Sequence, residues 1–315
     1  MSKIIVTGGA GFIGSHFVNF LLANTTHEVV IIDNLTYAGN MKNENGTNKF
    51  INDNFTFINK SICDVTKEDL GDFEYVVNFA AETHVDNSIL NGSPFVKTNV
   101  EGTFNLIEIS RKNKSLKKFI QISTDEVYGD MDEISKYTCA IESFRLKPSS
   151  YYSATKASSD MLILSAHRTF GLPYIITRTC NNYGENQHKE KFIPKIIDSL
   201  KNNYEIPVYG DGKQVREWIY VGDNVKAIYN ILISDEINDI FNIGTEERYE
   251  NIELLNMISQ SLGVNPRYKF VKDRLGHDLR YSLDSTKYEK KFGKIKTISF
   301  NEWILKYSKQ ENLIG

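Results

Sequence analysis

A doubly wound α/β fold is predicted by three observations. Short, continuous apolar segments alternate with helical patterns through the first half of the chain. A glycine-rich turn lies directly between the first apolar segment and the first helical pattern. The chain has 315 residues, of which 41% are hydrophobic, so it can bury a large core. Continuous apolar strands separated by helices are typical of a parallel sheet covered on both faces, and right-handed crossovers then give a Rossmann-like doubly wound fold.

The expected elements follow from the apolar and helical patterns. The predicted strands are Lys3–Gly8, Glu28–Asp33, Phe55–Ile62, Glu74–Ala80, Lys117–Thr124 and Pro173–Cys180. The predicted helices are Phe12 to about Ala23, Thr98–Arg111, and one that follows the fifth strand and runs through Lys156. An Asn-rich segment, Met41–Asn54, is expected to form a polar surface loop.

The rhythm of the sequence changes after about Asn181. Elements become shorter, with turn clusters at Tyr209–Lys213 and Asn242–Glu247. Helical patterns recur at Phe192–Leu200, Asp223–Ile233 and Asn251–Leu262. We therefore expect a cofactor-binding domain over residues 1–180 and a smaller mixed α/β substrate-binding domain over 181–315, with some exchange of chain between the two.

Composition and charge exclude several classes of protein. The net formal charge is −3, which gives no indication of a nucleic-acid partner. The cysteines Cys63, Cys139 and Cys180 form neither a disulfide framework nor a CxxC pair, and no metal site is expected. No long apolar run suggests a membrane span, and the amino terminus does not resemble a signal peptide. A soluble cytoplasmic protein is the expectation.

The glycine-rich turn, Thr7–His16, predicts a dinucleotide site. Gly8, Gly11 and Gly14 stand three residues apart after a strand and before a helix, which is the context that this motif requires. The helix amino terminus would supply N–H donors to a pyrophosphate. Asp33 ends the second strand, where a carboxylate accepts hydrogen bonds from the adenosine ribose and repels a 2′-phosphate, so NAD is favoured over NADP. Asp64, after the third strand, is a candidate for the adenine amino group.

Two groups of residues predict catalysis at the carboxyl ends of the strands. Tyr152 and Lys156 lie four apart on a predicted helix, and a neighbouring lysine is expected to lower the pKa of the phenol and make it a general base. Asp125 and Glu126 follow Thr124 at the end of the fifth strand, where two adjacent carboxylates are costly unless they are used or paired. Like-charge repulsion between such acids can give them opposite protonation states.

These motifs together resemble a known family. Thr7–His16 and Tyr152–Lys156 are similar to the extended short-chain dehydrogenases/reductases that act on nucleotide sugars. The segments STDEVYGD, AAETHVDNSI, NNYG, YGDGKQVREWIYV and DRLGHDLRY resemble the dTDP-glucose 4,6-dehydratases, from residue 3 to about 285. The chain departs from the usual pattern at Tyr151 and Leu275, where proline is common, and in the short stretch Met131–Lys147.

The resemblance implies a three-step reaction with bound NAD, followed by release of dTDP-4-dehydro-6-deoxyglucose for deoxysugar biosynthesis. Tyr152, assisted by Lys156 and Thr124, takes the proton of the glucose 4-hydroxyl while C4 is oxidised. Glu126 then removes the C5 proton, and Asp125 protonates the C6 hydroxyl, which leaves as water. The hydride returns to C6 and C5 is reprotonated, so the enzyme is a lyase without net oxidation.

The resemblance also implies further site residues and a homodimer built from helices like Thr98–Arg111 and Ser153–Thr169. The implied NAD contacts are Gly8, Gly11, Phe12, Ile13, Gly14, Asp33, Asn34, Leu35, Thr36, Asp64, Val65, Phe79, Ala80, Ala81, Thr98, Tyr152, Lys156 and Asn182. The implied substrate contacts are Thr83, Thr124, Asp125, Glu126, Asn181, Lys191, Phe192, Pro207, Val208, Tyr209, Arg216, Asn242, Arg274 and His277.

Two other readings stay open at this point. A UDP-sugar 4-epimerase or decarboxylase, or a 4,6-dehydratase of another nucleotide sugar, shares most of these motifs, although the Asp125–Glu126 pair argues against the first two. A catalytically silent NAD-binding regulator needs the glycines and Asp33 but not Tyr152, Lys156 and the two carboxylates.

Overall fold

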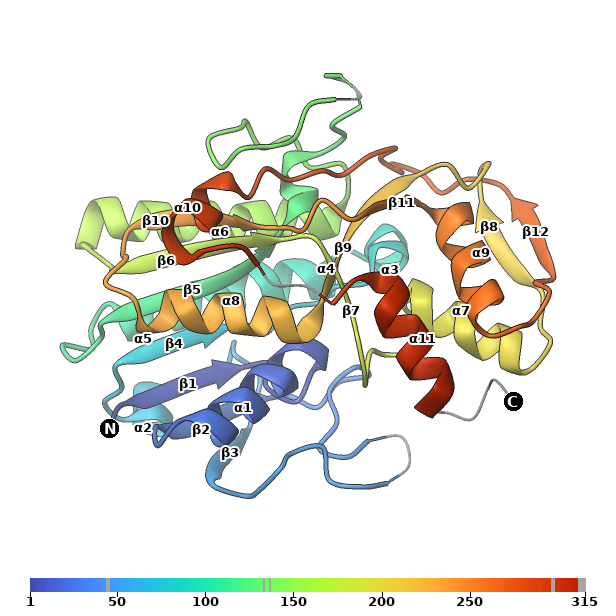
Figure 1. Cartoon of the computed structure of the whole chain (residues 1–315). Coiled ribbons are helices and arrows are strands. Elements are labelled where there is room, and N and C mark those ends of the chain that lie inside the picture. The colour runs from blue at the N-terminus through green and yellow to red at the C-terminus, as the bar shows by residue number, and fades with distance from the viewer. Residues whose placement is uncertain (44–45, 133, 136, 296–297, 311–315) are drawn as a thin grey trace.

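Seven parallel strands form the central sheet, in the order β10-β6-β5-β4-β1-β2-β3 (Figure 1). The computed structural model describes residues 1–43, 46–132, 134–135, 137–295 and 298–310. The strands of the sheet are β1 (Lys3–Thr7), β2 (Glu28–Asp33), β3 (Phe55–Asn59), β4 (Tyr75–Asn78), β5 (Lys118–Thr124), β6 (Tyr174–Thr179) and β10 (Asp239–Ile243). The predicted Rossmann-like doubly wound fold is confirmed, because each neighbouring pair is parallel and the order reverses between β1 and β4.

Helices cover both faces of the sheet, as its apolar strands require (Figure 1). The helices α1 (Phe12–Asn24) and α8 (Val221–Ile233) pack together on one face, around a core that includes Phe17, Ile31 and Ile228. The helices α5 (Thr103–Ser110) and α6 (Tyr151–Phe170) cover the other face. The short helices of this half are α2 (Lys67–Leu70), α3 (Val85–Leu90) and α4 (Ser93–Phe95).

The second half of the chain contributes to the large sheet and also forms two small ones. Strand β10 returns to pair with β6, and α10 (Thr286–Phe292) packs beside it. One small sheet has the order β11-β9-β7 and the other pairs β12 with β8. The remaining elements are β7 (Asn181–Tyr183), α7 (Phe192–Lys201), β8 (Ile206–Tyr209), β9 (Val215–Tyr220), β11 (Arg248–Glu250), α9 (Asn251–Ser261), β12 (Tyr268–Val271) and α11 (Phe300–Gln310).

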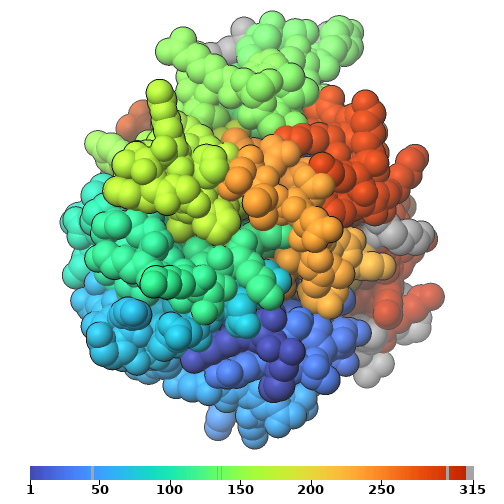
Figure 2. Space-filling model, turned by 90° about the vertical axis from the view of Figure 1, so that its left-hand side faces the viewer, coloured from blue at the N-terminus to red at the C-terminus, as the bar shows by residue number. Residues whose placement is uncertain are grey.

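The segment between β5 and α6 differs from the prediction of a continuous helix. A single 3₁₀ turn, η2 (Asp125–Tyr128), follows β5, and α6 begins only at Tyr151, where Ser150 and Ser153 form a capping box. The described part of the intervening segment projects from the molecule at the top of Figures 1 and 2. Part of this stretch, Met131–Lys147, and part of the polar loop expected over Met41–Asn54 lie outside the described residues.

The helix predicted over Thr98–Arg111 begins as a π-helix, η1 (Val96–Gly102), and continues as α5. Asn99 explains this irregularity. Its side chain donates to the Thr155 hydroxyl at 3.0 Å and to the Glu82 carbonyl at 3.1 Å, and its own carbonyl accepts from Ser159 at 2.6 Å. The π turn therefore connects α6 to the segment after β4, which is consistent with the frequent occurrence of such turns at functional sites.

Candidate active site

The glycine turn between β1 and α1 forms a close-packed cradle. Gly8 has φ +65°, and a Cβ added there would lie 2.6 Å from the Ala80 amide nitrogen. A Cβ on Gly14 would lie 2.2 Å from the Gly8 carbonyl oxygen. Helix α1 begins at Gly11 without a side-chain cap, so the N–H groups of its first turn face the cradle. This arrangement fits the pyrophosphate of a dinucleotide.

Substitution of Gly14 or Gly11 by alanine is expected to weaken cofactor binding to different degrees. Gly14→Ala places a methyl group against backbone, where overpacking costs about 1–3 kcal/mol. Gly11→Ala brings its Cβ only to 3.1 Å from the Gly8 carbonyl oxygen and should be milder. We expect Gly14→Ala to lose most of its bound NAD, measured in the denatured, purified protein, and Gly11→Ala to retain more. Equal NAD content in both variants and the parent would contradict the cradle.

Asp33, at the end of β2, is fixed by backbone amides. One carboxylate oxygen accepts from Ala10 at 2.9 Å and the other from Leu35 at 2.8 Å. Burial raises the pKa of Asp33, whereas these bonds and the charge of Lys49 lower it. Lys49, in the loop that was expected to be surface, also donates to the Ala10 carbonyl at 2.8 Å. Lys49 was missed because a lone lysine in an Asn-rich loop carries no local signal.

The other residues predicted for NAD lie around this edge, since the carboxyl ends of parallel strands meet there. Phe12 and Ile13 are half-buried in the first turn of α1, and Asn34, Leu35 and Thr36 are exposed after β2; Phe79, Ala80 and Ala81 follow β4, and Thr98 lies in η1. Asp64 is exposed after β3, but Val65 is 3% exposed within the core, so only its backbone faces the site.

The catalytic candidates converge from β5, η2 and α6. The Thr124 hydroxyl donates to Asp125 at 3.1 Å and accepts from the Glu126 amide at 3.3 Å. It also makes a hydrogen bond with Tyr152 that lowers the pKa of the phenol. The buried ring of Phe95 meets the Tyr152 ring edge-on at 6.4 Å. The structure thus brings together Thr124, Asp125, Glu126 and Tyr152.

The predicted lowering of the Tyr152 pKa by Lys156 is not found in this structure. Burial raises the pKa of Tyr152, and the negative charge of Glu126 raises it further. The Lys156 ammonium instead donates to the Ile122 carbonyl at 2.6 Å, and burial lowers its pKa to about 8. The phenol is therefore protonated in the protein alone, because desolvation outweighs the effect of the nearby lysine.

The two adjacent carboxyl groups have different environments. Asp125 is 2% exposed, and its pKa is raised well above the ordinary value by burial and then by the charges of Glu126 and Glu217. Burial also raises the pKa of Glu126, but Arg216, Arg274 and Lys191 favour its ionised form. The protonated form is therefore favoured more strongly at Asp125 than at Glu126, which is the order that an acid and a neighbouring base require.

Lys191 and Arg274, whose charges act on Glu126, lie among other predicted substrate residues. The Lys191 ammonium donates to the carbonyl and hydroxyl of Thr83, both at 3.2 Å. Arg274 lies 3.5 Å from Asp86, which also accepts from the Tyr209 hydroxyl at 3.3 Å. His277 contacts Asp273 at 2.6 Å, and burial followed by the charge of Arg274 lowers its pKa to about 4.

The remaining predicted substrate residues have buried or half-buried side chains. Arg216 is 5% exposed, donates to the Asp278 carbonyl at 3.0 Å and lies over the Tyr281 ring at 4.3 Å. Half-buried side chains are those of Asn181 in β7, Phe192 at the start of α7 and Pro207 in β8.

Three residues predicted to contact NAD or substrate have side chains that are buried or hydrogen-bonded within the protein. Asn242 has no exposed surface; its amide accepts from Tyr128 at 2.8 Å and donates to Ala140 and Asp284 carbonyls. Val208 is buried in a core cluster. The Asn182 amide donates to the Cys180 carbonyl at 2.9 Å and accepts from Asn224 at 2.8 Å. The side chains of Asn242 and Val208 are thus buried and the Asn182 amide is engaged within the protein, and the ligand contacts predicted for these residues stay predictions.

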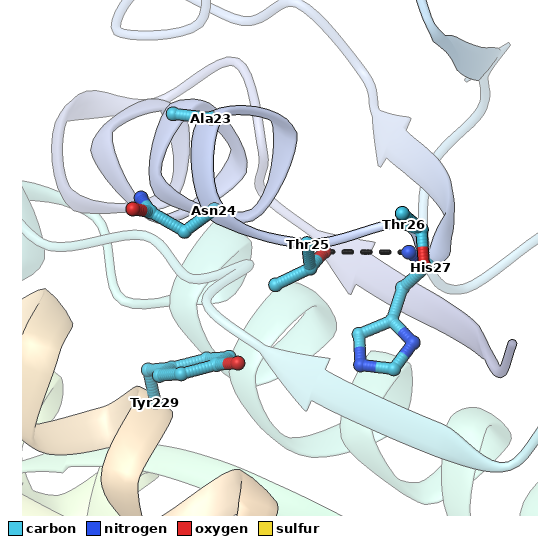
Figure 3. A pocket seen from close by; sticks show the side chains of 6 residues that line it. All are labelled: Ala23, Asn24, Thr25, Thr26, His27 and Tyr229. Atoms are coloured by element: carbon cyan, nitrogen blue, oxygen red, sulfur yellow. Dashed lines mark hydrogen bonds between the residues drawn. The ribbon is translucent and has the colours of Figure 1, made fainter.

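A shallow surface pocket at the end of α1 is not a candidate site. It is lined by Ala23, Asn24, Thr25, Thr26, His27 and Tyr229 (Figure 3). His27 there accepts a hydrogen bond from the Ser2 amide at 3.3 Å, and its own amide donates to Thr25. The pocket lies at the amino edge of the sheet, opposite the edge where the catalytic candidates meet. Among the described residues, no cluster of His, Cys, Asp and Glu could hold a metal ion.

Comparison with known proteins decides the family. The sequence profile described as the NAD dependent epimerase/dehydratase family matches residues 4–244. The chain belongs to this family. Among the residues that the structure describes, no helix is long and apolar enough to cross a membrane.

Relatives within the NAD-dependent epimerase/dehydratase family confirm the resemblance to dTDP-glucose 4,6-dehydratases. A Neisseria meningitidis dTDP-glucose 4,6-dehydratase is 40% identical, over 97% of this chain and 92% of its own. The Haloferax volcanii low-salt glycan biosynthesis protein Agl12 is 46% identical, over 90% of both chains. The dTDP-glucose 4,6-dehydratase DesIV of Streptomyces venezuelae, solved with NAD bound, has a TM-score of 0.91 at 39% identity, over 98% of this chain and 97% of its own.

Proposed function

We propose that the protein catalyses the NAD-dependent dehydration of dTDP-glucose to dTDP-4-dehydro-6-deoxyglucose and water. The observation that carries this proposal is the pair Asp125 and Glu126 beside Tyr152: burial raises the pKa of both carboxyl groups, that of Asp125 the more strongly, because Arg216, Arg274 and Lys191 act on Glu126 in the opposite direction. The similarity to the Neisseria and Streptomyces dTDP-glucose 4,6-dehydratases supports the substrate. The reaction is a hydro-lyase reaction, since nothing is oxidised overall.

In the proposed mechanism, Tyr152 accepts the proton of the glucose 4-hydroxyl. Thr124 holds the phenol, and Lys156 stabilises the phenolate that forms. Bound NAD supplies a reversible hydride acceptor and a positive charge that favours the phenolate. The residues that would hold it are the cradle glycines, Asp33 and the backbone after β4.

Elimination then uses the carboxyl pair. The 4-ketone makes the C5 hydrogen acidic, and Glu126 removes it as a base. Asp125 donates its proton to the C6 oxygen, which leaves as water. The hydride taken from C4 is then returned to C6 and C5 is reprotonated, which gives the 4-dehydro-6-deoxy product. Arg216 and Arg274 are the proposed diphosphate ligands because guanidinium groups pair well with phosphate oxygens, and Thr83 with Lys191 is proposed to position the hexose.

Incubation with dTDP-glucose and added NAD tests the proposal. The expected result is the alkali-developed absorbance of a 4-keto-6-deoxy sugar nucleotide, without net formation of reduced cofactor. Product from UDP- or GDP-sugars but not from dTDP-glucose would retain the reaction and change the nucleotide. Epimerised sugar without dehydration would instead indicate a 4-epimerase, a class that includes the Bacillus cereus UDP-glucuronic acid 4-epimerase, which has a TM-score of 0.88 at 28% identity.

The predicted homodimer stays part of this proposal, with α5 and α6 as the contact. Large apolar side chains are exposed on these helices and on η1, namely Val96 at 46%, Phe104 at 51% and Met161 at 47%. Beside them, a groove is lined by Val100, Leu146, Pro148, Ala154, Ala157, Ser158, Met161 and Leu162. An apolar surface of this extent is typical of a protein–protein contact.

Charge on this surface is expected to separate the dimer. Phe104→Glu with Met161→Glu places two carboxylates in the apolar contact, where their desolvation is unfavourable. Light scattering at micromolar concentration should show a dimer for the parent and a monomer for the variant. Ile233→Glu is the control, because Ile233 is 57% exposed on α8, on the opposite face of the sheet. A monomeric parent would contradict the proposal.

The division at residue 180 and the cytoplasmic location also stay proposals. Strand β10 joins the large sheet and α8 packs with α1 on its face, which supports the expectation that the two parts share chain. The described cysteines are free, which is consistent with a reducing compartment.

A further inference from the structure

A buried ion pair lies directly behind the lysine of the site. Asp160 follows Lys156 by one helical turn on α6. Arg178, on β6, donates through Nε to Asp160 Oδ2 at 3.0 Å. Asp160 is 0% exposed and Arg178 is 2% exposed. Such a fully buried pair is weak evidence of a contribution to stability, because desolvation offsets the attraction between the charges. Its presence at this position therefore calls for another explanation.

The second carboxylate oxygen of Asp160 is not used by Arg178. Oδ1 has no hydrogen-bond partner among the described residues, although the Ser123 hydroxyl lies close enough to lower the pKa of the carboxyl group. Asp160 is also the carboxylate whose charge raises the pKa of Lys156 against the effect of burial, and Lys156 in turn lowers that of Asp160. The three charges therefore alternate, from Lys156 through Asp160 to Arg178.

Other charged or titratable groups approach from the elements packed on α6. Arg178 comes from β6, and its Nη1 donates to the Tyr128 hydroxyl of η2 at 2.9 Å and to the Glu142 carbonyl at 3.2 Å. Asp125 and Glu126 of η2 act on Tyr152, on the side of Lys156 away from the ion pair. Arg178 thus contacts Asp160, the Tyr128 hydroxyl and the Glu142 carbonyl. These contacts fix its position and allow it to orient Asp160.

We propose that Asp160 is a positioning residue that keeps Lys156 protonated beside Tyr152, and that Arg178 fixes that carboxylate in place. The proposal rests on the role proposed above for Lys156. Without the carboxylate, the buried ammonium of Lys156 would still be desolvated but would lose the charge that offsets this effect, so the lysine would lose its proton at lower pH. A neutral lysine no longer stabilises the phenolate of Tyr152.

The first test is the pH–rate profile of Asp160→Asn, which preserves the shape of the side chain. We expect the alkaline limb of kcat to move to lower pH by about one to three units, as removal of a close opposite charge should do. Activity should be recovered as the pH is lowered, and KM for dTDP-glucose should change little. A kcat that is reduced equally at every pH, with unmoved limbs, would mean a structural role and would overturn the proposal.

A second variant removes both charges of the pair. In Asp160→Asn with Arg178→Gln, Lys156 is desolvated without an opposite charge, as it is in the single variant. The alkaline limb is therefore expected to stay at the lowered position of Asp160→Asn. A limb that returns to its position in the parent enzyme would show that the charge of Asp160 is not what keeps Lys156 protonated, and would overturn the proposal.

A measurement without substrate separates this proposal from the proposed function. The Lys156 pKa of about 8 in the folded protein is below the value of about 10.4 for a free lysine. The unfolded chain binds more protons between these values, so Lys156 makes stability rise with pH through that window. Thermal unfolding against pH, compared with Lys156→Met, isolates this contribution.

In the Asp160→Asn background, the rise should begin at lower pH. The same onset in both backgrounds would overturn the proposal whatever the substrate is. A shifted onset together with no product from any sugar nucleotide would retain the assignment of Asp160 and reject the proposed function.

Discussion

Tyr152→Phe is expected to lower the rate of dehydration by about 10²–10⁴-fold, the range that a positioned acid or base contributes. The phenol is 9% exposed and makes a hydrogen bond with Thr124, so its removal leaves no other group in position to accept the 4-hydroxyl proton. Product formation from dTDP-glucose, measured by the alkali-developed absorbance, checks the prediction.

The neighbouring tyrosine provides a matched control. Tyr151 is 62% exposed and begins α6 one residue earlier. Tyr151→Phe removes an equivalent hydroxyl from an exposed position at the helix start and should leave the rate within about twofold, in line with the small effects of surface changes. Equal losses in the two variants would indicate a disturbed helix start and would remove Tyr152 from the mechanism.

Asp125→Asn is expected to block elimination while it spares oxidation at C4. The side chain is 2% exposed and its pKa is raised well above the ordinary value by burial and by two neighbouring carboxylates, which favours the protonated acid. An amide has the same shape but does not donate a proton to the leaving oxygen. We expect overall product to fall by about 10²–10⁴-fold, while the near-ultraviolet absorbance of reduced nicotinamide rises on mixing with substrate.

A second carboxylate on the same segment serves as the control for Asp125→Asn. The side chain of Asp132 is 36% exposed and lies 3.7 Å from Arg280. Asp132→Asn should leave both oxidation and product formation near the parent rates. Full dehydration by Asp125→Asn, combined with loss of activity in Tyr152→Phe, would show that the assigned acid is wrong.

The parallel sheet and the cradle could be predicted from sequence because their signals are local. A buried parallel strand is a short apolar run, and the glycine spacing follows from the closeness of Gly8 and Gly14. Strand positions were predicted within a few residues. The helix after β5 was misplaced, since Asp125 to Tyr128 form one isolated turn whose end is set by Gly129 at φ +76°.

The parts that sequence did not reveal depend on long-range contacts. Asn99 forms its bonds with residues 17 and 56 positions away, and Lys49 reaches a carbonyl 39 positions away. The raised pKa of Tyr152 follows from burial, which the four-residue spacing to Lys156 does not report. The burial of Asn242 follows from the pairing of β10 with β6, which brings the Asn242 side chain into hydrogen-bond contact with Tyr128.

The position of β10 has a consequence for how the chain acquires its structure. The chain leaves the large sheet after β6 at Thr179 and returns to that same strand at Asp239, so the last strand of the sheet is synthesised some 60 residues after its neighbour. Until then, β6 is an edge strand with unpaired backbone groups, and the face later covered by α8 is open. Exposed edges of this kind template association between chains. A nascent or truncated chain ending near residue 180 is therefore prone to aggregate, and completion of the sheet requires that the intervening segment be made first.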